Sequence, residues 1–264
     1  MKTNTRIAMY WAVAALGVAA LSQSLQAQNN LAQMARVNEL YGYQIVSSDN
    51  QKIGKLNNMM IDLETGRILY CVIGTSKGRV GVAPEIFDVT PASKELHISV
   101  PKAKIDSAPQ FSAEADTPTE WGKAGFVDQV YQYFGQRAWW QGNGPANVGI
   151  FHNVHKSSDL LGMKVEDVSN QSLGKVQNVI VNLRGGRVLY VLLAPDSRLK
   201  LASALYPLPP QALTPSADGK NLVSGIDQQK LASAPHFDSK SPPNFSDRTY
   251  ASQVYQYYGK QPWF

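Results

Sequence analysis

Two groups of side chains in this sequence have types and spacings that could support chemistry. Asp62 and Glu64 lie close together and could form a carboxylate pair for acid–base catalysis. His152, His155 and Asp159 would share one face of a helix and could there ligate a metal ion. Both groups also fit simpler interpretations, the carboxylates as turn residues and the histidines as solvated residues of a linker. We favour the simpler interpretation for both.

Nucleophilic chemistry finds little support in the sequence. No Ser-His-Asp arrangement is recognisable, and the glycine-containing stretches at 78–84 and 184–187 lack the Lys-Ser/Thr pair of a phosphate-binding loop. Cys71 is the only cysteine, so the chain cannot form an internal disulfide. Its apolar neighbours favour a small buried hydrophobe over a reactive or dimer-forming thiol. The sequence therefore predicts no catalytic residues, no cofactor and no metal, and hence no enzyme.

Large aromatic residues near the end of each half are the candidates for binding. They are Trp139, Trp140, Trp263 and Phe264. Tryptophan is enriched among the residues that dominate protein–protein interfaces. The alternative is that these side chains fold back onto their own domain. We take the four as possible partner-binding residues.

The elements that must position these residues occur twice. The segment 53–73, IGKLNNMMIDLETGRILYCVI, matches the segment 173–193, LGKVQNVIVNLRGGRVLYVLL. The pairs identical in both are Gly54/Gly174, Lys55/Lys175, Asn58/Asn178, Leu63/Leu183, Gly66/Gly186, Arg67/Arg187, Leu69/Leu189 and Tyr70/Tyr190. Each segment predicts a β-hairpin, with strands at 55–63 and 67–73 or at 175–183 and 187–193. Gly66 and Gly186 suit the left-handed position of the turn.

Further repeats extend each copy. The segments 96–100 and 221–226 each predict a later strand, and FVDQVYQYFG (126–135) matches YASQVYQYYG (250–259). Apolar residues in the latter pair recur with helical spacing, and Gly135 and Gly259 suit helix C-caps. The sequence thus predicts a first domain at 36–140, a linker at 141–157 and a second domain at 158–264. An amphipathic helix covers each domain.

The N-terminus has the build of a secretory signal peptide. Lys2 and Arg6 precede an apolar run at 7–21, and small Ala27 ends the segment. We expect residues 1–27 to be cleaved, leaving no transmembrane segment; an uncleaved anchor is the alternative, for which the run is short. The formal net charge of the 264-residue chain is +5, and the basic residues are scattered, so we expect no nucleic-acid partner.

The pattern L-x-G, then G-K-V/L-x-N, an apolar strand and G-R-V/I-L-Y resembles the PRC-barrel family. That family is named for the cytoplasmic domain of the photosynthetic reaction-centre H subunit. The resemblance covers 40–111 and 160–237, and copy 2 departs from the pattern at 197–213. It implies a mainly β fold of two tandem small barrels, and a role in assembly or interaction without catalytic residues.

The functional hypothesis is an exported, non-catalytic binding or scaffold protein in the bacterial periplasm, or secreted, with a protein partner in the cell envelope. A duplicated domain suits bridging or avid binding. Two alternatives remain: an accessory subunit of a membrane electron-transfer complex, and an enzyme with a site between the two barrels, where clefts commonly hold ligands.

Overall fold

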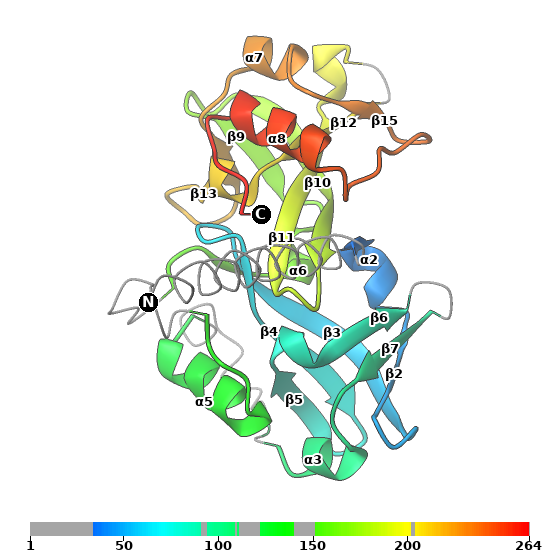
Figure 1. Ribbon diagram of the computed structural model, residues 1–264. Coiled ribbons are helices and arrows are strands. Elements are labelled where there is room, and N and C mark those ends of the chain that lie inside the picture. The colour runs from blue at the N-terminus through cyan, green and yellow to red at the C-terminus, as the bar shows by residue number, and fades with distance from the viewer. Residues whose placement is uncertain are drawn as a thin grey trace, which may run out of the picture.

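The computed structural model describes residues 34–90, 94–108, 110, 122–139, 151–201 and 204–263. Two barrels of β-strands lie end to end, the first below and the second above in Figure 1. The first contains β2 (Gln44–Val46), β3 (Lys52–Asp62), β4 (Arg67–Thr75), β5 (Gly78–Val82), η1 (Pro84–Ile86), β6 (Phe87–Thr90), β7 (Glu95–Ile98), α3 (Lys102–Asp106) and α5 (Ala124–Phe134). The second contains β9 (Lys164–Asp167), β10 (Ser172–Asn182), β11 (Arg187–Pro195), η2 (Ser197–Leu199), β12 (Ala204–Leu208), η3 (Pro210–Ala212), β13 (Leu213–Pro215), β14 (Leu222–Ser224), α7 (Gln228–Ala232), β15 (Phe237–Asp238) and α8 (Arg248–Tyr257).

A long antiparallel hairpin forms the centre of each barrel, β3–β4 in the first and β10–β11 in the second. Gly66 and Gly186 have φ of 64° and 58°, so both turn glycines adopt the left-handed conformation predicted for them. Gly54 and Gly174 serve another purpose. A Cβ on Gly54 would lie 1.9 Å from the carbonyl oxygen of Gly74, and the second barrel has the same close approach. The repeated glycines therefore let the two strands of each hairpin approach closely.

The remaining strands repeat the same pairing. β7 runs parallel to β2, and β14 runs parallel to β9. β5 pairs with β4, and β12 pairs with β11, so the second copy forms this strand even where its sequence departs from the first.

Helices α5 and α8 each lie along one face of their own barrel, in green and red in Figure 1. Tyr70 of β4 meets Phe126 of α5 edge to face, with ring centroids 5.2 Å apart. In the second barrel Tyr190 meets Tyr250 with the same interplanar angle of 73°. The repeated tyrosine is thus one contact that hairpin and helix share in both barrels.

The two barrels share one sheet. Arg67 of β4 pairs with Arg187 of β11, and the flanking backbone groups exchange hydrogen bonds. The N–H of Ile68 donates to the carbonyl of Gly186, and the N–H of Val188 donates to that of Gly66, both at 3.0 Å. We call this junction the seam. The reciprocal bonds relate the barrels by an approximate two-fold axis through it.

The segment before each barrel crosses to the other one. β1 (Met34–Arg36) and α2 (Val37–Leu40) contact β10 of the second barrel. β8 (Val154–Lys156) and α6 (Ser157–Leu160) contact β3 of the first barrel. We call 34–40 and 154–160 the exchanged arms. The predicted linker at 141–157 therefore ends in a strand that pairs with the first barrel.

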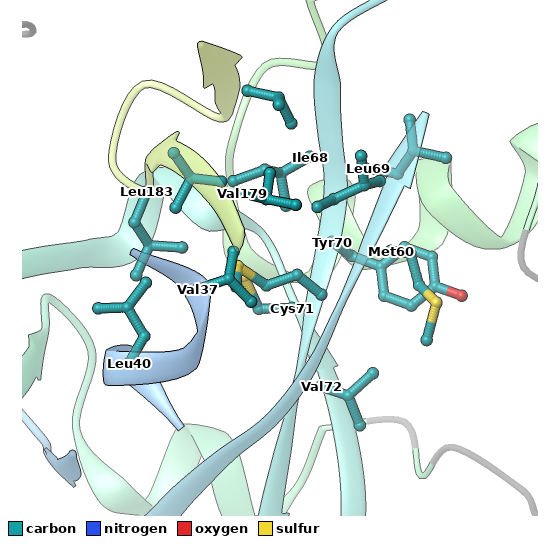
Figure 2. Close-up of a cluster of buried hydrophobic side chains, with 14 of the residues drawn as sticks. Val37, Leu40, Met60, Ile68, Leu69, Tyr70, Cys71, Val72, Val179 and Leu183 are labelled. Carbon is teal, nitrogen blue, oxygen red and sulfur yellow. The ribbon is translucent and has the colours of Figure 1, made fainter. Parts of the chain in front are cut away.

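The hydrophobic core continues from one barrel into the other. Figure 2 shows Leu40 of the first arm and Cys71 of the first barrel in one cluster with Leu183 of the second. Cys71 is fully buried, and burial raises the pKa of its thiol well above the ordinary value. Within the described residues, no helix has the length and apolar character needed to cross a membrane. The predicted signal peptide at 1–27 lies outside the described residues.

Candidate functional site

The seam brings two arginine side chains together. Arg67 and Arg187 each follow the turn glycine of their hairpin and lie opposite each other across the junction. Burial lowers the pKa of both guanidinium groups, and for Arg187 the pKa falls to about 10, with the charge of Arg67 as the second cause. Two like charges are therefore held near each other in a partly desolvated position, which costs free energy unless other groups compensate.

Each arginine lies against a tryptophan of its own barrel. The guanidinium carbon of Arg67 is 4.7 Å from the ring centre of Trp139, and that of Arg187 is 5.2 Å from the ring centre of Trp263. Such cation–π contacts contribute roughly 0.5–2 kcal/mol, more where the groups are desolvated. The tryptophans thus offset part of the cost of burying the two charges.

Residues of η1 and η3 complete the seam from opposite sides. A Cβ on Gly186 would lie 3.2 Å from the carboxylate of Glu85, and one on Gly66 would lie 2.5 Å from the amide nitrogen of Gln211. Each turn glycine therefore also makes room for the other barrel. Burial raises the pKa of Glu85, while a 3.3 Å hydrogen bond donated by Tyr131 and the charge of Arg67 favour its ionised form.

The chemistry available at the seam is that of recognition. It contains two guanidinium groups, one half-buried carboxylate and two half-buried tryptophans. The nearby Cys71 is a poor nucleophile because burial keeps its thiol protonated.

The four predicted binding residues are only partly described. Trp139 and Trp263 are half-buried and lie over the seam arginines, so both fold back onto their own barrels. Trp139 also packs against Phe151, with ring centroids 6.2 Å apart. Trp140 and Phe264 lie outside the described residues. Partner binding by these four stays a prediction.

The predicted carboxylate pair, Asp62 and Glu64, consists of one buried and one exposed residue of the same turn. Asp62 is buried, and its Oδ2 accepts hydrogen bonds from the N–H and the hydroxyl of Thr65. Glu64 is exposed. In the second barrel Asn182 accepts a 2.7 Å hydrogen bond from the N–H of Gly185. An amide therefore serves where the first barrel has a carboxylate, which fits a turn-forming role.

The histidines do not share a helix face. His155 lies in strand β8, and its Nε2 is 2.9 Å from Oδ1 of Asn153. Burial lowers the pKa of His155. His152 is exposed at a bend before the strand, and Asp159 belongs to α6. Within the part of the chain that the structure describes, no three His, Cys, Asp or Glu side chains form a group suited to a metal ion.

A G-x-S-x-G spacing occurs at 74–78, with Ser76 at its centre. In a nucleophile elbow this motif turns sharply from a strand into a helix. Here it connects the antiparallel strands β4 and β5, and Ser76 is exposed at the tip. The hydroxyl of Thr75 donates to the carbonyl of Gly78, which makes the segment an ordinary turn.

Comparison with known families agrees with this architecture. The family model described as "PRC-barrel domain" matches residues 32–107 and residues 152–223, which are two copies in tandem. Each match begins two residues before an exchanged arm. No curated protein matches the chain.

Proposed function

The chain belongs to the PRC-barrel family, with two copies of the domain, and from this premise we propose a non-catalytic binding or scaffold protein that assembles protein partners in the cell envelope. The observation that carries the proposal is the seam. It fixes two equivalent barrels about an approximate two-fold axis. A partner therefore meets two similar surfaces in one fixed orientation, which favours simultaneous binding at both.

The proposed location is the periplasm or the outside of a bacterial cell. The support is the basic, apolar and small-residue order of residues 1–27, with cleavage after Ala27. The intact mass of the protein from its native cell tests this. A mass that includes residues 1–27 would favour a membrane-anchored protein.

Trp140 and Phe264 are the better binding candidates, because Trp139 and Trp263 already contact arginines of the seam. A pull-down from envelope extract separates the two pairs. The bait is compared with a Trp140→Ala, Phe264→Ala variant and, as a control, with Glu64→Gln in an exposed turn. We expect a partner to be lost only with the first variant.

A variant with Trp139→Ala and Trp263→Ala is the structural control. Its thermal melting temperature shows whether loss of these two tryptophans destabilises the seam. Retention of every partner by the Trp140, Phe264 variant contradicts their role. Failure to recover any partner, together with turnover of a small molecule by the pure protein, would favour an enzyme instead.

A further inference from the structure

A hollow in the second barrel lies beside the seam and shares Gln211 with it. It has a volume of about 680 Å³ and lies where η3, β13, β14 and the end of α8 meet. Sites for small organic molecules typically measure about 300–1,000 Å³. The hollow is therefore large enough for a small ligand.

Exposed apolar side chains gather at this hollow. Val168 and Tyr257 are the large apolar residues that the described parts of the chain expose most, at 74% and 37%. Both line the hollow. Isolated exposed apolar residues need no explanation, but two at the edge of one concave surface indicate a place where an apolar group binds.

Two lysines supply positive charge. Lys230 of α7 and Lys260 after α8 line the hollow. Within the described parts of the chain, neither ammonium group has an ion-pair partner. Both are therefore available to an anionic group of a ligand.

The first barrel shows how the hollow arises. Ile86 ends η1 as Ala212 ends η3, and Ile98 ends β7 as Ser224 ends β14. Both isoleucines are buried. Two large side chains that fill this corner in the first barrel are thus replaced by two small ones in the second. The replacement opens a cavity at this corner.

We propose that this hollow binds a small aromatic carboxylate. The aromatic body contacts Tyr257 and Val168, and the carboxylate accepts hydrogen bonds from Lys230 and Lys260. The site belongs to the second barrel alone, so it adds a ligand to the scaffold role and does not depend on it.

Titration of the purified full-length protein with cinnamate tests the proposal, with neutral cinnamamide as the matched probe. We expect saturable cinnamate binding in the micromolar-to-millimolar range. Cinnamamide should bind about fivefold more weakly, since one charge-assisted hydrogen bond contributes on the order of 1 kcal/mol. Changes in the amide NMR signals of Gly225 and Gly259 should report the site.

Three variants sharpen the test. Lys230→Gln with Lys260→Gln should weaken cinnamate binding about tenfold and leave cinnamamide binding unchanged. Ala212→Ile with Ser224→Ile, which copies the first barrel, should abolish binding of both probes. Lys104→Gln, in the corresponding helix α3 of the first barrel, should change neither.

No binding of cinnamate at millimolar concentration would overturn the proposal, as would equal affinity of wild type and the lysine variant. If the double-isoleucine variant fails to fold, the lysine variant and Tyr257→Ala at the exposed edge decide the question.

Discussion

The corner between η1 and β7 of the first barrel is filled, whereas the matching corner between η3 and β14 of the second barrel is hollow. Ile86 and Ile98 pack this corner in the first barrel, and Ala212 and Ser224 occupy it in the second. The seam differs far less, because both barrels keep the turn glycine, the arginine and its tryptophan. Residues that each barrel needs to contact the other are thus retained, whereas the corner between η3 and β14 has changed.

The exchanged arms show a second difference. Ser157 of the second arm is fully buried and bonded to three groups of the first domain: the N–H of Met59, Oδ1 of Asn58 and the hydroxyl of Tyr41. The first arm has Val37 at the matching position, buried among apolar residues. The second arm therefore adds a polar network to its apolar packing, whereas the matching position of the first arm is apolar.

Separating the barrels should have the largest effect. A fragment of residues 152–263 retains its arm but lacks β3, the strand with which that arm pairs. The equivalent strand is β10 of a second copy, so we expect a symmetric homodimer with twice the fragment mass by light scattering. The same fragment without 152–160 should not dimerise. A well-folded monomer at high concentration would contradict the exchange of arms.

Gly54→Ala and Gly174→Ala should each cost about 3–5 kcal/mol of unfolding free energy, because the new Cβ meets a backbone oxygen that cannot move away. A Cβ would lie 1.9 Å from that oxygen at Gly54 and 2.1 Å at Gly174. Urea denaturation should show similar losses in the two variants. Gly125→Ala, where nothing lies within 4 Å, is the control and should not destabilise the protein. A tolerated substitution in one barrel alone would show that the hairpins differ.

Ser157→Ala should cost about 1–2 kcal/mol, because Tyr41, Asn58 and the N–H of Met59 each lose one partner, while Met59 and Asn58 stay bonded to each other. Ser157→Val, which copies the first arm, should cost as much, since valine cannot restore these hydrogen bonds. Ser76→Ala, at the exposed tip of the turn between β4 and β5, is the control and should change stability by less than about 0.5 kcal/mol. Equal melting temperatures of all three variants would contradict a stabilising role for the polar network around Ser157.

Asp62→Asn should have the smallest effect and should raise stability at neutral pH by up to about 1 kcal/mol. Burial raises the pKa of Asp62 above 3.8, so its ionised form is disfavoured in the folded protein. That cost is absent below pH 3.8 and develops as the pH rises through the raised pKa. Denaturation across this range should show the gain growing with pH. A gain that is constant or falls with pH would contradict burial of the ionised carboxylate as its cause.

Local features of the fold were predictable because neighbouring residues determine them. The tandem family resemblance is confirmed, and so is the left-handed turn at Gly66 and Gly186. Periodicity and turn chemistry act over a few residues and leave a clear pattern.

The exchange of arms was not predictable from the sequence. β1 and β8 are three residues long, too short for a periodic signal, and their partners lie far away in the chain. The contact between Arg67 and Trp139 also joins residues that no local rule connects. The hollow was not predictable for a different reason. It depends on small residues in and after the segment 197–213, and in that segment the second copy departs from the first.

The central claim is that the two barrels form one structural unit joined by the seam and the exchanged arms. Scanning calorimetry of the full-length protein tests it most directly. We predict a single transition whose calorimetric and van't Hoff enthalpies agree, because neither barrel keeps its edge strand when the other unfolds. Two separable transitions, each with about half of the total enthalpy, would contradict it.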